Sequence, residues 1–428
     1  MKLRLTAIAT SLFFALPVAD VRSELPSPDG GTVLTAERLF DARSGRMIQS
    51  PVVLVKGDRI VSVQSGGAIP AGVKVIRLDG MTLLPGLIDM HTHIDSDPSY
   101  GGYSDLQFSD RFWSMIAVPN AYKTLLAGFT TIRNVGSGGW NDVGLKQAID
   151  AGKVPGPRIV PAAKSFGATG GHCDSTFFPP SMDQKSPFNA DSPEEARKVV
   201  RTLRKYGAEV IKICATGGVF SRNTEPGQQQ MSLAEMKAIA DDAHMYGLKV
   251  AAHAHGANGI KDAIRAGIDT IEHASLIDDE GIELARKYGT YLSMDIYNTE
   301  YTQSEGKKNG VLEDNLRKDR EVADAQREGF RKAHKAGVKM VYGTDAGVHP
   351  NGENGKQFRW MVTYGMTPAE AMQSATLHSA EALGRKDIGV LEAGRFADII
   401  AVKGNPASDA GLLEKVDFVM KGGVVYKE

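Results

Sequence analysis

Five short segments hold the side chains most able to do chemistry, and each lies at the end of an apolar run. They are Asp89-Met90-His91-Thr92-His93, Val210-Ile211-Lys212, Ala252-His253, Ile271-Glu272-His273 and Gly343-Thr344-Asp345. Imidazole nitrogens and carboxylate oxygens bind divalent metal ions, and a pair of neighbouring ions supports hydrolysis. The segments therefore suit a two-metal hydrolytic site assembled from distant parts of the chain.

His91 and His93 are two residues apart at the end of the first of these runs. In a strand this spacing points both side chains to the same side, where they can bind one divalent ion. A His-x-His pattern alone is more often a pair of histidines that bind nothing. The preceding Pro85-Gly86-Leu87-Ile88-Asp89 makes the metal hypothesis much stronger.

Lys212 lies among β-branched apolar residues in Val210-Ile211-Lys212-Ile213-Cys214. Burying a charged lysine there is unfavourable unless it pairs with an acid or loses its charge. Carboxylation by carbon dioxide removes the charge and gives a carbamate whose two oxygens can bridge two metal ions. From the residues alone, a buried ion pair is the simpler expectation and the carbamate is the alternative.

His253 and His273 follow strand-like runs and are candidate ligands of a second ion. His255 lies on the same face as His253, so the sequence leaves open which of the two is the ligand. We favour His253 because it lies deeper in its apolar run. His255 then contacts the substrate, supports a ligand, or has no role.

Asp345 ends the last apolar run, Met340-Val341-Tyr342-Gly343. A carboxylate at that position can bind a metal ion and accept the proton of an attacking water molecule. A lone aspartate after Gly-Thr is also common as a turn residue or helix cap. The agreement of all the candidate groups in type and order favours the catalytic interpretation.

The scaffold must bring these strand ends together. Apolar strand candidates cover residues 83–90, 130–135, 158–163, 209–214, 249–254, 270–273, 290–296 and 339–343. Helical patterns fall between them, and those at 192–206 and 232–246 each begin at a capping serine and end at Tyr-Gly. This alternation predicts an α/β fold, a (β/α)₈ TIM barrel, with a doubly wound open sheet as the alternative. The barrel places every candidate ligand at a strand C-terminus, where such enzymes build their sites.

Both ends of the chain alternate short β-like runs with glycine turns. We therefore expect residues 24–84 and 386–428 to form one small composite β-sandwich domain, and residues 85–385 to form the barrel. Residues 1–23 resemble a bacterial signal peptide, because Lys2 and Arg4 precede an apolar stretch at 5–19. A buried N-terminal helix is the alternative. The expected location of the mature protein is the periplasm or the medium.

Composition and charge give no sign of a nucleic-acid or membrane partner. The formal net charge of −1 gives no reason to expect nucleic acid or an anionic membrane as partner. No segment after the leader approaches about 20 uninterrupted apolar residues, so no membrane association of the mature form is expected. Cys173 and Cys214 are the only cysteines and lie near the candidate site segments. We expect two free thiols there, not a disulfide scaffold.

The chain resembles the metal-dependent amidohydrolase superfamily. It is most similar to the imidazolonepropionase-related branch, with Xaa-Pro dipeptidases, carboxypeptidase-like members and ochratoxin-hydrolysing amidases. The resemblance rests on the segment 85–93, Ile211-Lys212 followed by Thr216-Gly217-Gly218, His253, Ile271-Glu272-His273 and Gly343-Thr344-Asp345. It extends to residues 389–398, which resemble the family's return to its small domain.

This resemblance implies two divalent metal ions, usually zinc, with a distinct set of ligands for each. His91, His93 and Asp345 would bind the more buried ion, and His253 and His273 the other. A carboxylated Lys212 would bridge them, which reverses the expectation from the residues alone. Asp345 would also take the proton of the attacking water and pass it to the leaving nitrogen.

The substrate contacts are less well marked. By resemblance, Thr169-Gly170-Gly171-His172 is the substrate loop, with His172 near the scissile group. A flexible glycine loop with an exposed histidine is the alternative. Arg222 and Tyr297, just beyond strand ends, are candidates for binding a substrate carboxylate, although such loop residues are more often plain surface. Asn134 stands where relatives often have aspartate, which leaves the contacts of that strand in doubt.

The expected activity is hydrolysis of the amide of a dipeptide or N-acyl amino acid, releasing a C-terminal residue such as proline or phenylalanine. The latter would include ochratoxin A, giving phenylalanine and ochratoxin alpha. The alternatives are a mononuclear deaminase or imidazolone-type ring hydrolase, against which Lys212 argues, and a non-catalytic binding barrel. The family also implies a homo-oligomer, with an octamer as in some relatives.

Overall fold

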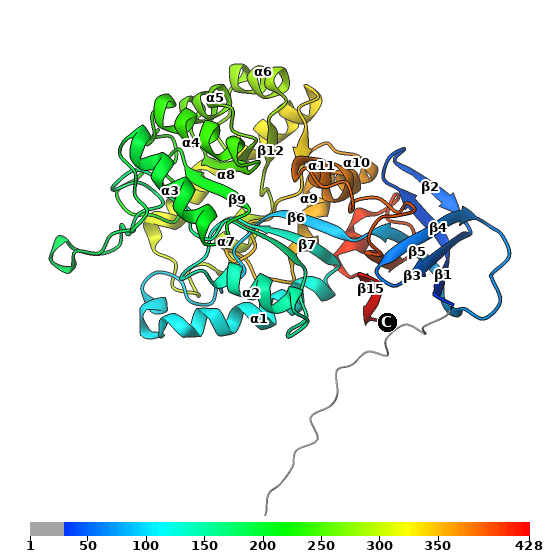
Figure 1. Ribbon diagram of the computed structural model, residues 1–428. Helices are drawn as coiled ribbons and strands as arrows, with labels where there is room; N and C mark the ends of the chain where they lie inside the picture. The colour runs from blue at the N-terminus through cyan, green and yellow to red at the C-terminus, as the bar shows by residue number, and fades with distance from the viewer. Residues whose placement is uncertain (1–29) are drawn as a thin grey trace, which may run out of the picture.

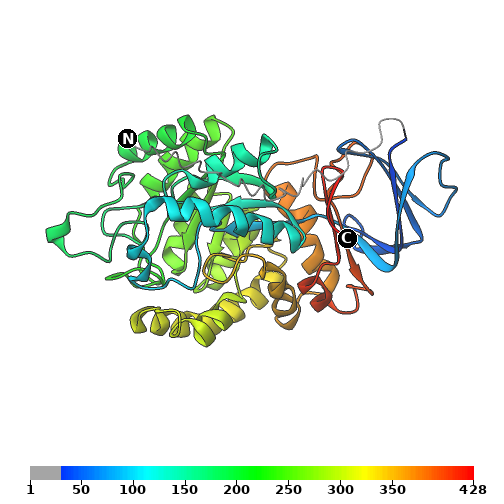
Figure 2. The ribbon, with the colours of Figure 1, turned by 90° about the horizontal axis from the view of Figure 1, so that it is seen from below.

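The computed structural model describes residues 30–428, so the expected signal peptide at 1–23 lies outside the described residues. Figure 1 shows two regions side by side, and Figure 2 shows the same from below. One region is a sheet built from both ends of the described chain. The other is a larger assembly in which strands and helices alternate, and it contains all the candidate site residues.

The strands of the larger region form two parallel sheets, with the orders β6-β7-β8 and β9-β10-β11-β12-β13. They are β6 Leu87–Thr92, β7 Phe129–Asn134, β8 Arg158–Pro161, β9 Val210–Cys214, β10 Lys249–Ala254, β11 Thr270–His273, β12 Tyr291–Ser293 and β13 Met340–Val341. Each overlaps one of the predicted runs. β6, β7, β9 and β11 are buried at every residue, as parallel strands covered on both faces require.

Backbone hydrogen bonds join the two sheets at both edges. Beyond β8, Phe166 forms a parallel bridge with Ile213 of β9, and its carbonyl accepts a 2.9 Å hydrogen bond from the Cys214 amide. At the other edge the Met90 amide donates to the Tyr342 carbonyl at 2.8 Å. The carboxyl ends of strands from both sheets therefore come together.

Helices follow most of these strands. They are α1 Asp110–Leu126, α2 Asn141–Asp150, α3 Pro193–Lys205, α4 Leu233–Met245, α5 Ala257–Ala266, α6 Asp279–Tyr288, α7 Asn298–Glu305, α8 Glu313–Lys335, α9 Gln357–Thr363, α10 Pro368–Gln373 and α11 Ser379–Ala382. Shorter turns are η1 Ser104–Gln107, η2 Pro180–Met182, η3 Asn354–Lys356, the π-helical η4 Ser374–His378 and η5 Ala410–Glu414. Among residues 30–428, no helix combines the length and apolar character needed to cross a membrane.

Two helices confirm the capping analysis. The Ser192 side chain accepts a hydrogen bond from the Glu195 amide at the start of α3, and Ser232 and Glu235 form a full capping box on α4. Both helices end at a tyrosine before glycine, as predicted. On α3 the buried residues are Ala196, Val199, Val200 and Leu203, a helical spacing that turns one face inward.

Strands from both ends of the described chain form one eight-stranded sheet. Its strands are β1 Thr32–Asp41, β2 Arg46–Gln49, β3 Pro51–Lys56, β4 Arg59–Ser65, β5 Lys74–Pro85, β14 Ile399–Lys403, β15 Phe418–Lys421 and β16 Val424–Lys427. β5 connects the two ends, because it pairs with β1 in parallel and with β14 antiparallel. The sheet has an apolar core of its own, to which both ends contribute residues such as Leu34, Val53, Ile399 and Phe418.

Candidate active site

The predicted ligands on β6 and after β13 meet at one buried point. Asp345 Oδ1 lies 3.4 Å from His91 Nε2 and 3.4 Å from His93 Nε2. Among the described residues, this buried oxygen has no hydrogen-bond partner. Burial raises the pKa of Asp345 to about 7 despite the opposing charge of His273. An orphaned carboxylate oxygen facing two imidazole nitrogens is a donor set that fits a divalent cation.

Two of the candidate ligands, Asp345 and His273, have a strained backbone conformation. Asp345 has φ 58° and His273 has φ 67°, and Ala274 follows with φ 49°. Left-handed conformations are unfavourable for residues other than glycine and concentrate at functional sites. Here they turn the chain at the ends of β13 and β11, where the candidate ligands stand.

Three histidines on β10, after β10 and on β11 form a second donor group. His253, His255 and His273 are buried, and their potential ligand atoms all lie within 4.8 Å of one another. His253 Nε2 faces the Gly217 carbonyl at 3.2 Å, which leaves Nδ1 as its free nitrogen. His255 Nδ1 lies 2.8 Å from Ser275 Oγ. Both His253 and His255 are thus close enough to serve as a ligand beside His273.

His273 also belongs to a donor group with His91 and Asp345, so the two groups share a residue. Lys212 stands next to them, with Nζ 3.4 Å from His91 Nε2 and only 3% of the residue exposed. Within residues 30–428, no carboxylate lies within 4.0 Å of Nζ, so the simple ion pair expected from the residues alone is not formed. Burial lowers the pKa of Lys212 to about 8, which brings the neutral amine close to physiological pH.

A second layer of polar contacts orients the histidine rings. His91 Nδ1 donates to Glu272 at 3.0 Å, His93 Nδ1 donates to the Gly136 carbonyl at 3.0 Å, and His273 Nδ1 donates to Asp295 at 2.9 Å. Each contact directs the other ring nitrogen toward the candidate metal position. Burial lowers the pKa of His91 and His93, which keeps both neutral, whereas Asp295 outweighs burial and raises that of His273.

Sequence reasoning assigned no role to Glu272, Arg133 or Asp295, although all three contribute here. Glu272 is fully buried and pairs with Arg133 at 2.6 Å. Asp295 accepts hydrogen bonds from Gln326 at 3.0 Å and Asn298 at 3.2 Å. The available signal was a charged residue inside or directly after an apolar run, the signal used for Lys212.

Asn134 resolves the doubt about the second strand. Its side-chain oxygen accepts a hydrogen bond from the Ile94 amide at 2.7 Å, and its nitrogen donates to Asp142 at 3.2 Å. An aspartate at this position could accept the first bond but would face the Asp142 carboxylate without a proton to donate. The amide therefore suits this contact between β7 and α2.

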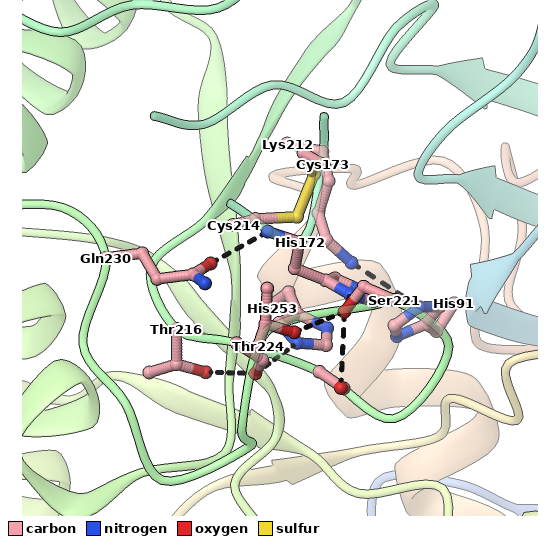
Figure 3. The surroundings of a disulfide bond; sticks show 12 residues. His91, His172, Cys173, Lys212, Cys214, Thr216, Ser221, Thr224, Gln230 and His253 are labelled. Atoms are coloured by element: carbon pink, nitrogen blue, oxygen red, sulfur yellow. Dashed lines mark hydrogen bonds between the residues drawn. A yellow bond between two sulfur atoms is a disulfide. The ribbon is translucent and has the colours of Figure 1, made fainter. Parts of the chain in front are cut away.

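The expectation of two free thiols is wrong, because Cys173 and Cys214 form a disulfide with a Cα–Cα distance of 5.8 Å (Figure 3). The sequence separation of 41 residues gave no sign of it. The reason is tertiary: the segment after β8 pairs with β9 through Phe166 and Ile213, which brings the His172 loop to the end of β9. The disulfide thus attaches the residue after His172 to the strand that carries Lys212.

His172 lies against the second donor group. Its ring stacks on His253 with centroids 4.1 Å apart, and its Nδ1 lies 2.8 Å from Ser221 Oγ (Figure 3). Gly218 leaves the space for this ring, since a Cβ there would lie 2.4 Å from it. His172 therefore borders the same cavity as the candidate ligands.

Two connected cavities reach the site. An inner cavity of about 340 Å³ is bordered by His91, His93, His172, Lys212, His253, His255, His273 and Asp345. It adjoins an outer cavity of about 860 Å³, and His93, Lys164, Ser165, Phe220 and Val348 border both. One cavity therefore contains all six predicted ligands.

Arg222 and Tyr297 are not brought to either cavity. Arg222 is exposed, donates to the Tyr103 hydroxyl at 2.9 Å and borders a separate surface cavity. The Tyr297 ring packs against His349, with centroids 5.1 Å apart. The structure therefore gives no support to their predicted contact with a substrate carboxylate.

Several known proteins are similar to this chain over most of its length. The Aspergillus niger ochratoxinase is 31% identical over 406 residues, which cover 87% of this chain and 82% of the relative. A crystal structure of an Xaa-Pro dipeptidase with bound methionine in the active site has a TM-score of 0.88 and 36% identity, over 93% of this chain and all of the other. A prolidase complexed with N-methylphosphonate-L-proline has a TM-score of 0.85 and 29% identity, over 93% and 99%.

The family described as Amidohydrolase family matches residues 82–427, which span every candidate ligand, the strands β6 to β13 and the C-terminal strands β14, β15 and β16 of the other sheet. Its members are generally metal-dependent hydrolases, in agreement with the two buried donor groups. On this match and on the 31% identity to the ochratoxinase, the chain belongs to the amidohydrolase family and is a hydrolase that acts on amide bonds.

Proposed function

We propose that this chain is a binuclear metal-dependent amidohydrolase that cleaves a dipeptide or N-acyl amino acid and releases its C-terminal amino acid. The observation that carries the proposal is the convergence of two buried donor groups in one cavity beside Lys212: His91 with His273 and Asp345, and His253 with His255 and His273. In the proposed assignment His91, His93 and Asp345 would hold one ion and His253 and His273 the other, with His255 as the alternative to His253. Nitrogen-rich sites of this kind suit zinc.

Lys212 is proposed to be carboxylated and to connect the two groups. The neutral amine is the form that reacts with carbon dioxide, and burial lowers the pKa of this amine to about 8. The lysine has no carboxylate within 4.0 Å among the described residues, so no ion pair holds its charge. A metal pair bound here would supply Lewis acidity and lower the pKa of water for attack on the amide carbonyl.

Asp345 is the proposed proton carrier. Asn298 donates to its Oδ2 at 3.0 Å, which fixes the carboxylate and leaves Oδ1 toward the ligands. A carboxylate whose pKa burial raises to about 7 accepts and returns a proton near neutral pH. It would take a proton from the attacking water and deliver it to the leaving nitrogen. His172, stacked on His253, would contact the scissile group.

The relatives and the outer cavity support the substrate class. The similar proteins are named ochratoxinase, Xaa-Pro dipeptidase and prolidase. Trp113, Phe177 and Tyr301 border the outer cavity of about 860 Å³, which suits a large apolar group on the substrate. Proline or phenylalanine are therefore the proposed leaving residues, and ochratoxin A, giving phenylalanine and ochratoxin alpha, is one proposed substrate.

The two parallel sheets joined at both edges support closure into a (β/α)₈ barrel over residues 85–385. The sheet formed by both ends supports the composite small domain at 24–84 and 386–428, with its β-sandwich packing as part of the proposal. Export to the periplasm or the medium is proposed with a signal peptide at 1–23, and the disulfide supports it, because disulfides persist in oxidising compartments. Assembly as a homo-oligomer, an octamer as in some relatives, completes the proposal.

A product screen tests this function. Chain stripped with a chelator and reloaded with zinc would be offered dipeptides and N-acyl amino acids that vary at the C-terminal position. The proposal expects release of the free C-terminal amino acid that depends on metal. Ammonia release from aminopurines or ring opening of an imidazolone would instead indicate the deaminase or cyclic amide alternative. No turnover in any class would favour a binding barrel.

A further inference from the structure

Lys164 stands where the inner and outer cavities meet, and its charge is unpaired. It borders both cavities and is half-buried. Within residues 30–428, no carboxylate lies within 4.0 Å of its Nζ and its side chain makes no hydrogen bond. A lysine is rarely left in a cavity without a partner, since partial burial of its charge is unfavourable. An anionic group of a ligand would provide that partner.

The backbone fixes the position of Lys164. It follows Ala163, which has φ 60°, a left-handed conformation that costs energy for any residue with a Cβ. Two hydrogen bonds hold Ala163 there: its amide donates to Asp142 at 3.0 Å, and its carbonyl accepts from the Ser137 amide at 2.7 Å. The chain is thus turned and locked immediately before the lysine, which favours a positioned side chain over a free surface lysine.

The chemistry of the substrate limits where its carboxylate can bind. In an N-acyl amino acid the carboxylate carbon is only two bonds from the scissile nitrogen, of about 1.46 Å and 1.52 Å. When the amide lies among the metal-binding residues, the carboxylate must therefore lie at the edge of the inner cavity. Lys164 borders that cavity beside His93, Ser165 and Phe220.

The other cationic side chains near the site either have partners already or lie in the wrong place to bind this carboxylate. Arg133 pairs with Glu272, and Lys318 donates to the backbone carbonyls of residues 218, 221 and 224. Arg111 borders the outer cavity only. Lys212 lies beside His91, at the centre of the ligand set.

We propose that Lys164 binds the C-terminal carboxylate of the substrate and makes the enzyme selective for a free C-terminal acid. This role rests on the proposed function, because it requires the amide to lie in the inner cavity. It replaces Arg222 and Tyr297, the residues that the sequence suggested for this contact. Lys164 acts on substrate binding and takes no part in holding the metal ions.

A matched pair of substrates tests this role, with benzoate release measured for N-benzoyl-L-phenylalanine and for N-benzoyl-L-phenylalaninamide. The two substrates differ only at the C-terminal group, where a neutral carboxamide of nearly the same size replaces the carboxylate. Lys164→Met should lower kcat/KM for the acid about 10- to 100-fold, mainly through KM, as expected for one charge-assisted hydrogen bond. It should leave kcat/KM for the amide nearly unchanged, and Lys164→Arg should keep much of the preference for the acid.

Arg111→Met is the control, because it removes an exposed cation that borders the outer cavity alone. This variant should keep the wild-type ratio of kcat/KM for the acid to kcat/KM for the amide. Equal metal content and thermal midpoint in Lys164→Met would show intact folding, and Lys164→Gln provides a second variant if that one is unstable. Two results would overturn the assignment of Lys164 as the carboxylate-binding residue. One is a wild-type acid-to-amide ratio of kcat/KM in Lys164→Met, and the other is a similar fall of that ratio in Arg111→Met. Absence of turnover by the wild-type enzyme on the whole acyl amino acid panel would contradict the proposed function itself, and this role with it.

Discussion

The Arg133 guanidinium and the Glu272 carboxylate form a fully buried ion pair, with Nη2 and Oε1 2.6 Å apart. The other oxygen of Glu272 accepts a hydrogen bond from His91 Nδ1 at 3.0 Å. Arg133 lowers the pKa of Glu272 well below its usual range against the effect of burial, so the carboxylate stays ionised. It therefore keeps the proton on Nδ1 and presents Nε2 of His91 to Lys212 and Asp345.

Glu272→Gln should weaken metal binding about 10- to 100-fold, the usual effect of losing a partner behind a metal-binding histidine. The amide no longer fixes the tautomer of His91 and leaves the Arg133 charge without a counterion. Competition with a chromophoric chelator measures the change. Asp242→Asn is the control, since it weakens another arginine–aspartate pair, the exposed Arg201 with Asp242 at 2.7 Å, on helices outside the site. Unaltered metal affinity in Glu272→Gln would show that this contact does not tune His91.

The features that could be predicted are those set by residues that are neighbours in the sequence. Eight apolar runs located the strands, histidine, lysine or aspartate at the ends of several of them indicated the site, and Ser232 with Glu235 located the start of α4. The ligand candidates could be grouped because the ends of parallel strands lie at one edge of a sheet.

Pairings between distant segments could not be predicted from one sequence. Arg133 on β7 reaches Glu272 on β11 only because the two sheets come together, and the bridge from Phe166 to Ile213 brings Cys173 to Cys214. Lys164 was equally hidden, because its place depends on the left-handed Ala163 and on the carboxylate of Asp142. Loop residues such as Arg222 and Tyr297 were misplaced for the same reason.

Asp142 should make stability depend on pH. Burial, with the charge of Asp95, raises the pKa of Asp142 from 3.8 to about 7. Between about pH 4 and pH 7 Asp142 keeps its proton in the folded chain but releases it in the unfolded chain. The contribution of the protonated Asp142 to the free energy of unfolding therefore falls as pH rises, and it is lost above about pH 7. Urea midpoints of wild type and Asp142→Asn, compared at about pH 5 and about pH 8, measure it. Relative to wild type, the urea midpoint of Asp142→Asn should be higher at the higher pH than at the lower one. The same difference in midpoint at both pH values would refute this titration of Asp142.

The disulfide should be present in the native protein and should support the His172 loop. Unfolded, unreduced chain should show no reactive thiol, and reduction should release both cysteines. Replacing Cys173 and Cys214 by serine should lower the free energy of unfolding by about 4 kcal/mol, from the entropy of the closed loop, and should raise KM by loosening His172. Thiol titration and urea unfolding check this. Two reactive thiols in the unfolded chain without reductant would show that Cys173 and Cys214 are free and would contradict the disulfide.

The number of metal ions per chain tests the two-metal site most directly. Elemental analysis of zinc-loaded, desalted protein should give two ions per chain for the wild type, and Lys212→Ala should lose both the bound zinc and turnover. The reason is that two buried donor groups, His91 with Asp345 and His253 with His255, share His273, and the buried Lys212 Nζ lies 3.4 Å from His91 Nε2. A single ion per wild-type chain, or wild-type zinc content and activity in Lys212→Ala, would contradict the account.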